Sequence, residues 1–185
     1  MSLKAKLVSA IAAFCLVLAL MIVGIFAANS ATINMGGSIS FTTDSIYAKV
    51  AYTVTGNPGT ITGKDVTIDE DYTGPTEWNG INLTFDSTHT EIEVVITIQN
   101  LSATNAIDVS AETLPGASLS SGHITTTSQY KIGSGANTNL TTSTQDLTIE
   151  GGETMTITIT FNLVDQNDSY TANWEADFNL TSSAD

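Results

Sequence analysis

The sequence predicts an all-β protein, an antiparallel immunoglobulin-like or jelly-roll sandwich of about eight or nine strands, preceded by an N-terminal hydrophobic export helix. Two observations predict the sandwich. Apolar and polar residues alternate strictly in 154-TMTITITFNL-163 and again in 171-TANWEADFNL-180, which is the period of a strand with one buried face. The chain beyond residue 30 shows no helical periodicity. An antiparallel sandwich is the fold class in which one-sided strands of this kind meet.

The first thirty residues read as targeting sequence. Lys4 and Lys6 precede an uncharged stretch, 7–28, and the small residues of 28-ANS-30 favour a cut before Ala31. The alternative is a permanent N-terminal membrane segment, because 22 apolar residues can cross a bilayer. Both alternatives place 31–185 outside the cell or at its surface as a single domain. A signal peptidase is then a partner during export, and membrane contact is restricted to 7–28 if no cut occurs.

The same alternation predicts the remaining strands. In chain order they are 31–41, 46–54, 66–68, 81–85, 92–98 and 106–112, followed by about two short strands in the polar stretch 115–145. Threonines fill the outward positions of 154–163, and β-branched side chains suit a strand surface. Trp174 falls in the inward phase of its strand and is expected in the core.

Charge and chemistry exclude several function classes. After residue 30 the chain has three lysines, no arginine and all 19 acidic residues, a net charge of −16, so nucleic-acid binding is not expected. The one cysteine, Cys15, lies in the export segment, which leaves the domain without disulfides or thiol chemistry. His89 and His123 have no metal-ligand companion at a suitable spacing, and no nucleophile elbow or phosphate loop occurs. We therefore expect neither an enzyme nor a bound cofactor.

An acidic cluster raises a weak calcium hypothesis. Its members lie within seven residues of one another and are Asp65, Asp69, Glu70 and Asp71. Carboxylate oxygens are the ligands that calcium accepts, but their spacing does not match an EF-hand loop. A solvated acidic loop is the preferred explanation of the cluster.

Five Asn-x-Ser/Thr sequons are candidate glycosylation sites. They are Asn82, Asn100, Asn139, Asn167 and Asn179. In a chain this rich in Asn, Ser and Thr, several sequons are expected by chance. They matter only in a host that glycosylates exported proteins.

Three stretches together suggest a family. The lysine-containing start and long hydrophobic segment lead directly into a strand, 31-ATINMGGSISF-41. The middle carries 92-IEVVITIQNLSATNAIDVSAE-112, and the end carries 149-IEGGETMTITITFNL-163 followed by 174-WEADFNL-180. In this pattern the chain resembles the extracellular fibre subunits of the TasA and camelysin type. It is also similar to archaeal bundling-pilus and thread subunits.

The resemblance implies a secreted, pilus-like fibre or biofilm-matrix subunit that polymerises head to tail with copies of itself. In such fibres the N-terminal strand of one subunit completes a sheet of the next. Here the donor strand would be 31–43, with its alternating apolar residues Ile33, Met35, Ile39 and Phe41. Two alternatives stay open. The strand belongs to its own domain, or the protein is a membrane-anchored binding module that recognises glycans or a surface through 69–80 and 115–145.

Overall fold

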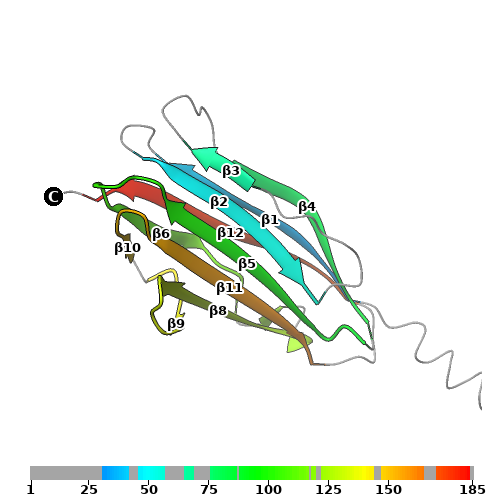
Figure 1. Cartoon of the computed structure of the whole chain (residues 1–185). Helices are drawn as coiled ribbons and strands as arrows, with labels where there is room; N and C mark the ends of the chain where they lie inside the picture. The colour runs from blue at the N-terminus through cyan, green and yellow to red at the C-terminus, as the bar shows by residue number, and fades with distance from the viewer. Residues whose placement is uncertain are drawn as a thin grey trace, which may run out of the picture.

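The chain folds into two β-sheets that face each other across an apolar core (Figure 1). This computed structural model describes residues 31–41, 46–56, 65–68, 76–86, 88–116, 118–119, 122–143, 147–164 and 170–183. Within those ranges no helix is long and apolar enough to cross a membrane. The expected export helix at 7–28 lies outside them.

The five-stranded sheet contains both ends of the described chain. Its strands, in spatial order, are β10 (Leu147–Ile149), β6 (Ile107–Thr113), β12 (Tyr170–Ser182), β1 (Ala31–Phe41) and β4 (Thr76–Phe85). The first strand, β1, runs parallel to β12 and antiparallel to β4. The expectation of a wholly antiparallel sandwich is therefore wrong at the β1–β12 pair. These two strands come from opposite ends of the chain, so no hairpin forces them to run antiparallel.

The seven-stranded sheet is antiparallel. Its spatial order is β3 (Asp65–Ile68), β2 (Ala48–Thr55), β5 (Glu91–Asn100), β11 (Thr154–Leu163), β8 (Ile124–Ile132) and β7 (Ser118–Leu119), with β9 (Thr138–Asn139) paired to β8. The long central strands β5 and β11 alternate between buried and partly exposed residues along nearly their whole length. That is the period-two pattern that predicted them.

The described residues contain twelve strands rather than eight or nine. Three of the extra strands, β7, β9 and β10, have two or three residues, too few to show a period. The stretch 115–145 also contains the nine-residue strand β8, where short strands were expected. Its inward positions include Thr126, which is buried, and Ser128, so the usual apolar signal is missing there.

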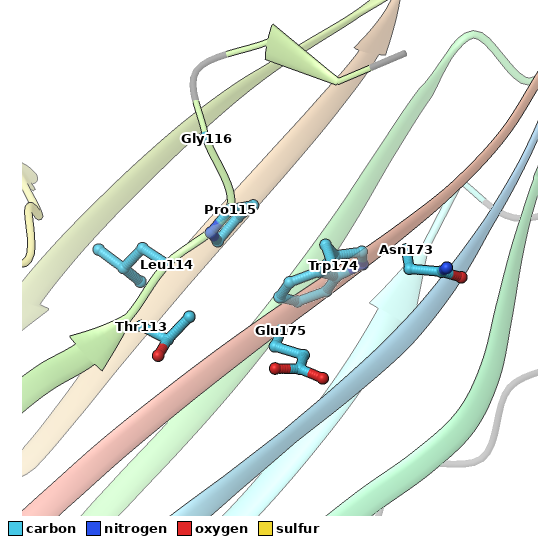
Figure 2. A pocket seen from close by; sticks show the side chains of 7 residues that line it. All are labelled: Thr113, Leu114, Pro115, Gly116, Asn173, Trp174 and Glu175. Carbon is cyan, nitrogen blue, oxygen red and sulfur yellow. The ribbon is translucent and has the colours of Figure 1, made fainter.

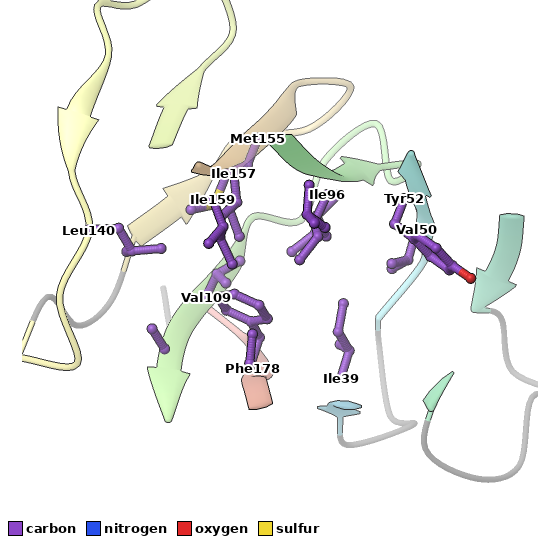
Figure 3. Packing of buried hydrophobic residues seen from close by; sticks show 14 of the residues in the cluster. Ile39, Val50, Tyr52, Ile96, Val109, Leu140, Met155, Ile157, Ile159 and Phe178 are labelled. Carbon is purple, nitrogen blue, oxygen red and sulfur yellow. The ribbon is translucent and has the colours of Figure 1, made fainter. Parts of the chain in front are cut away.

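The core is built mainly from isoleucine and aromatic side chains. Figure 3 shows Ile39 and Phe178 of the five-stranded sheet facing Ile96 and Ile157 of the seven-stranded sheet. Each of these four side chains is at most 1% exposed, and burial of such a group contributes roughly 1.5–3 kcal/mol of transfer free energy. The ring centroids of Phe161 and Trp174 lie 5.0 Å apart at 50°, so Trp174 is a core residue as predicted.

Candidate functional site

The N-terminal strand β1 occupies an interior position in its sheet. It pairs with β12 over all eleven residues, from Ala31 opposite Tyr170 to Phe41 opposite Leu180. On its other edge it pairs with β4, from Ala31 opposite Phe85 to Ile39 opposite Thr76. Among the described strands, β4 is joined to the rest of this sheet through β1 alone. The strand that the sequence singled out is therefore central to the sheet and not at its edge.

The glycine pair in β1 marks an irregularity in the pairing with β4. Met35 pairs with Ile81, but the next paired residue, Gly37, lies opposite Trp78, so β4 carries an extra residue opposite Gly36. This is a β-bulge, and glycine without a Cβ suits the close backbone approach at such a point. The pairing with β12 continues through Gly36 and Gly37 without a shift.

Of the four predicted assembly residues, Ile39 is the one whose side chain the structure describes. It is fully buried, and it pairs with Phe178, which is 1% exposed. The register pairs the other three, Ile33, Met35 and Phe41, with Ala172, Trp174 and Leu180 of β12 in turn. The structure thus brings all four positions onto one strand pair.

Two serines attach the polar side of β1 to β12. The Ser38 hydroxyl donates to the Asp177 carboxylate at 2.8 Å. The Ser40 hydroxyl lies 3.1 Å from the side-chain oxygen of Asn179 and 3.3 Å from the carbonyl oxygen of Phe178. Sequence reasoning missed these contacts, because serines at outward strand positions read as ordinary solvated residues. They help to fix the register of the pair.

The arrangement permits one specific interaction, in which an extended strand forms backbone hydrogen bonds along both of its edges. Without β1, strands β12 and β4 would face each other across a groove with unpaired N–H and C=O groups on both sides. Unpaired strand edges are templates for another chain. β1 ends at Phe41, and the next described residue is the buried Ile46, shortly before β2 of the other sheet; 42–45 lie outside the described residues.

The calcium hypothesis stays a prediction. Asp65 is the first residue of β3 and pairs with Ala51, while Asp69, Glu70 and Asp71 lie outside the described residues. Within the described ranges, no group of three or more His, Cys, Asp or Glu residues could hold a metal ion.

The sequons differ in accessibility. Asn82 and Asn139 are exposed, Asn179 is half-buried and Asn167 lies outside the described residues. Glycosylation at these four positions stays a prediction.

Asn100 differs from the other described sequons in being buried. Its side chain is fully buried, and its amide nitrogen donates to the carbonyl oxygens of Asn105 at 2.7 Å and Ile149 at 3.0 Å. Its side-chain oxygen accepts from the Ser102 N–H at 2.9 Å. The nitrogen that a glycan would modify is therefore engaged inside the fold, and glycosylation at Asn100 stays a prediction.

His89 lies in a turn that the Asp86 side chain closes. One oxygen of Asp86 accepts from the backbone N–H groups of Thr88 and His89 and from the Thr88 hydroxyl, at 2.7–2.8 Å. The His89 ring nitrogen Nδ1 lies 2.9 Å from the same oxygen. The hydrogen bonds from Thr88, followed by those from His89, hold the pKa of Asp86 well below its usual range. This is a side-chain-closed turn that ends β4 and leads into β5.

A hollow opens beside Trp174, where β6 has ended and β12 is paired on its other edge with β1. Figure 2 shows Trp174 and Glu175 on β12 beside Leu114 and Pro115 of the segment that follows β6. The hollow has about 280 Å³, slightly below the usual range of ligand pockets, about 300–1,000 Å³. Its lining includes one charged residue, Glu175, so it presents no convergent set of charged groups.

The fold and the position of β1 define a two-sheet β-sandwich whose N-terminal strand fills the interior of one sheet. No family model matches the chain, and no curated protein matches it. Among solved structures it is similar to the major pilin protein T-13 from Streptococcus pyogenes serotype GAS131465, with 9% sequence identity over 85% of this chain and 100% of that chain. The TM-score of that match is 0.20, a value too low to support an inference about function.

Proposed function

We propose that this protein is the structural subunit of an extracellular filament or biofilm-matrix fibre, and that it polymerises by donating β1 to the next subunit. The observation that carries the proposal is the interior position of β1, which pairs with β12 on one edge and with β4 on the other. A strand at this position supplies two ladders of backbone hydrogen bonds at once. Strand addition of this kind obtains its affinity from the main chain and its specificity from alternating side chains.

Exchange between copies replaces each contact with an identical one. A subunit that gives up its own β1 and receives that of a neighbour keeps the burial of Ile39 against the core and both hydrogen-bond ladders. Transfer of an identical element between protomers is therefore a low-cost route to association. Because donor and recipient are different surfaces of the subunit, the contact is head to tail and continues into a filament instead of closing as a dimer.

The export cut provides the switch in this proposal. Cleavage before Ala31 leaves the first residue of β1 as the new N-terminus, so the strand can leave one sheet and enter another. An uncut chain keeps the hydrophobic stretch 7–28 attached to that end. Assembly is then confined to the compartment in which cleavage occurs.

Negative-stain electron microscopy tests the proposal. Residues 31–185 contain every residue of the described core and are compared with 44–185, alone and mixed with a synthetic peptide of residues 31–43. We expect filaments from 31–185. We expect none from 44–185, and we expect the peptide to give folded single particles, because the peptide fills the groove without linking subunits.

Two results would overturn the proposal. Single particles from 31–185 at every concentration would favour the membrane-anchored binding module. Filaments from 44–185 without peptide would show that β1 is not the assembly element.

A further inference from the structure

The outer face of the seven-stranded sheet carries a regular array of threonines, here called the threonine face. It consists of the outward positions of β2, β5, β11 and β8, which alternate with the buried positions of the same strands. Its members are the odd-numbered residues from 49 to 55 on β2, from 91 to 99 on β5 and from 125 to 131 on β8, and the even-numbered residues from 154 to 162 on β11. All of them are exposed or partly exposed.

The threonine face is electrically balanced in a strongly acidic protein. It contains both lysines whose side chains the structure describes, Lys49 and Lys131, together with Glu91 and Glu93. The outer face of the five-stranded sheet differs sharply. Its described charged residues on β6 and β12 are all acidic, and they are Asp108, Glu112, Glu175 and Asp177. With a formal net charge of −14 for the chain, two copies repel each other at long range, and of the two described outer sheet faces the threonine face is the one whose own charges do not add to this repulsion.

The charges on this face are separated along the strands. Strand register places Lys131 in one row with Thr156 and Thr97, while Lys49 lies one row further toward the same end, opposite Gln99. The two glutamates lie at the other end, Glu93 opposite Thr160 and Glu91 opposite Asn162. The row between the two ends has no charge and consists of Thr53, Val95, Thr158 and Gln129.

From this pattern we infer that the threonine face binds the same face of a second copy, with the strands of the two copies antiparallel. In that orientation a two-fold axis lies in the plane of the contact, along the uncharged middle row, and the lysine end of each copy lies over the glutamate end of the other. The parallel orientation would place lysines over lysines and glutamates over glutamates. Charge complementarity therefore fixes both the partner and its direction.

The contact is expected to be weak for a single pair of subunits. Four strands about 4.8 Å apart and nine residues of about 3.3 Å rise give about 600 Å² on each copy, below the ~800 Å² per partner of a standard stable interface. Where the contact is repeated along two filaments, avidity would raise the overall affinity between them. The face belongs to the sheet that lacks β1, so this contact and the donation of β1 are independent and can occur together.

Charge-reversal variants test the contact, measured in a chain that cannot polymerise through β1. Ser40→Cys with Asn179→Cys ties β1 to β12 within one chain, because these residues are register partners and their side chains already touch. The association constant of this oxidised 31–185 monomer is measured by sedimentation equilibrium in low and high salt. We expect a dimer that weakens with salt, and at least tenfold weaker association for Lys131→Glu alone and for Glu93→Lys alone.

An equimolar mixture of the two variants provides the sharpest comparison. In an antiparallel pair residue 131 of each copy lies in the same row as residue 93 of the other, so in the mixed dimer both pairings bring opposite charges together and association should return to the original strength. Glu175→Lys on the other sheet is the control and should not weaken the dimer. The inference would be overturned if the disulfide-tied chain without a charge reversal stayed monomeric at all concentrations. It would also be overturned if the mixture of the two variants did not regain the original association constant. Loss of filaments in the electron-microscopy test would instead overturn the proposed function and leave this result standing.

Discussion

The Ser38 hydroxyl donates a 2.8 Å hydrogen bond to the Asp177 carboxylate and so joins two strands whose paired residues lie 139 positions apart in the chain. This bond lies on the outer face of the parallel β1–β12 pair, one residue from the fully buried Ile39. It ties the strand with the candidate assembly role to the last strand of the domain. A slip of β1 along β12 would break the bond.

Ser38→Ala should therefore loosen the attachment of β1. We expect a loss of about 1 kcal/mol in the free energy of unfolding, the usual contribution of such a bond, measured by urea denaturation. Ser110→Ala is the matched control, because the Ser110 hydroxyl bonds to Glu112 within its own strand and its loss leaves strand pairing intact. Equal effects of the two substitutions would contradict the role assigned to Ser38.

Asn100→Ala should be strongly destabilising. The change leaves the carbonyl oxygens of Asn105 and Ile149 and the N–H of Ser102 without their partner, at a cost of about 3 kcal/mol. In a domain of this size that lowers the Tm by about 10 °C, measurable by circular dichroism. Asn139→Ala, at an exposed sequon, should leave the Tm within about 1 °C.

Alanine substitutions at two glycines with positive φ distinguish the cost of backbone strain from the cost of a steric clash. Gly152 has φ +78° with open space at its Cβ position, whereas a Cβ on Gly56, at φ +79°, would overlap the backbone oxygen of Glu91. Gly152→Ala should cost about 1 kcal/mol for the left-handed conformation alone. Gly56→Ala should cost about 2 kcal/mol more, because β2 and β5 must shift apart. Equal unfolding free energies for the two variants would contradict this account.

Asp86 should contribute a pH-dependent share of stability. Its pKa is lowered in the folded protein by hydrogen bonds from Thr88 and His89, so its contribution is present above the ordinary value of 3.8 and is lost as the pH falls toward the folded pKa. We expect stability to fall less between pH 4 and pH 2 in Asp86→Asn than in the unchanged chain. The side chain is 38% exposed, so the difference should be small, and urea midpoints at both pH values measure it. A steeper acid loss in the variant would contradict the assignment.

Sequence alternation predicted the strands whose inward positions are apolar. β5, β11 and β12 have an inward residue of Ile, Val, Met, Phe, Trp, Leu or Ala at nearly every second position, so each shows its buried face directly. β8 was underestimated because Thr126 and Ser128 stand where apolar residues usually mark the core. The two- and three-residue strands β7, β9 and β10 are set by their neighbours and have no period of their own.

The candidate site was predictable as a strand but not in its surroundings. The alternation at Ile33, Met35, Ile39 and Phe41 indicated that 31–41 is a strand with one apolar face to bury. It gave no information on the neighbours β12 and β4, because pairing between distant segments is decided by tertiary packing. The same limit hid the structural role of Asn100, whose partners Asn105 and Ile149 meet it only in the folded domain.

One gel tests the central claim, that β1 is donated between subunits. Residues 31–185 contain no native cysteine, and Ser40 and Asn179 face each other across β1 and β12. The chain with Ser40→Cys and Asn179→Cys is assembled under reducing conditions, then oxidised, denatured and separated without reductant. Ser40→Cys alone is the control and can form at most covalent dimers.

The account predicts a ladder of covalent multimers, because in a filament each disulfide joins the β1 of one subunit to the β12 of the next. Monomers with a closed internal disulfide, and no ladder, would show that β1 stays in its own sheet and would contradict the account.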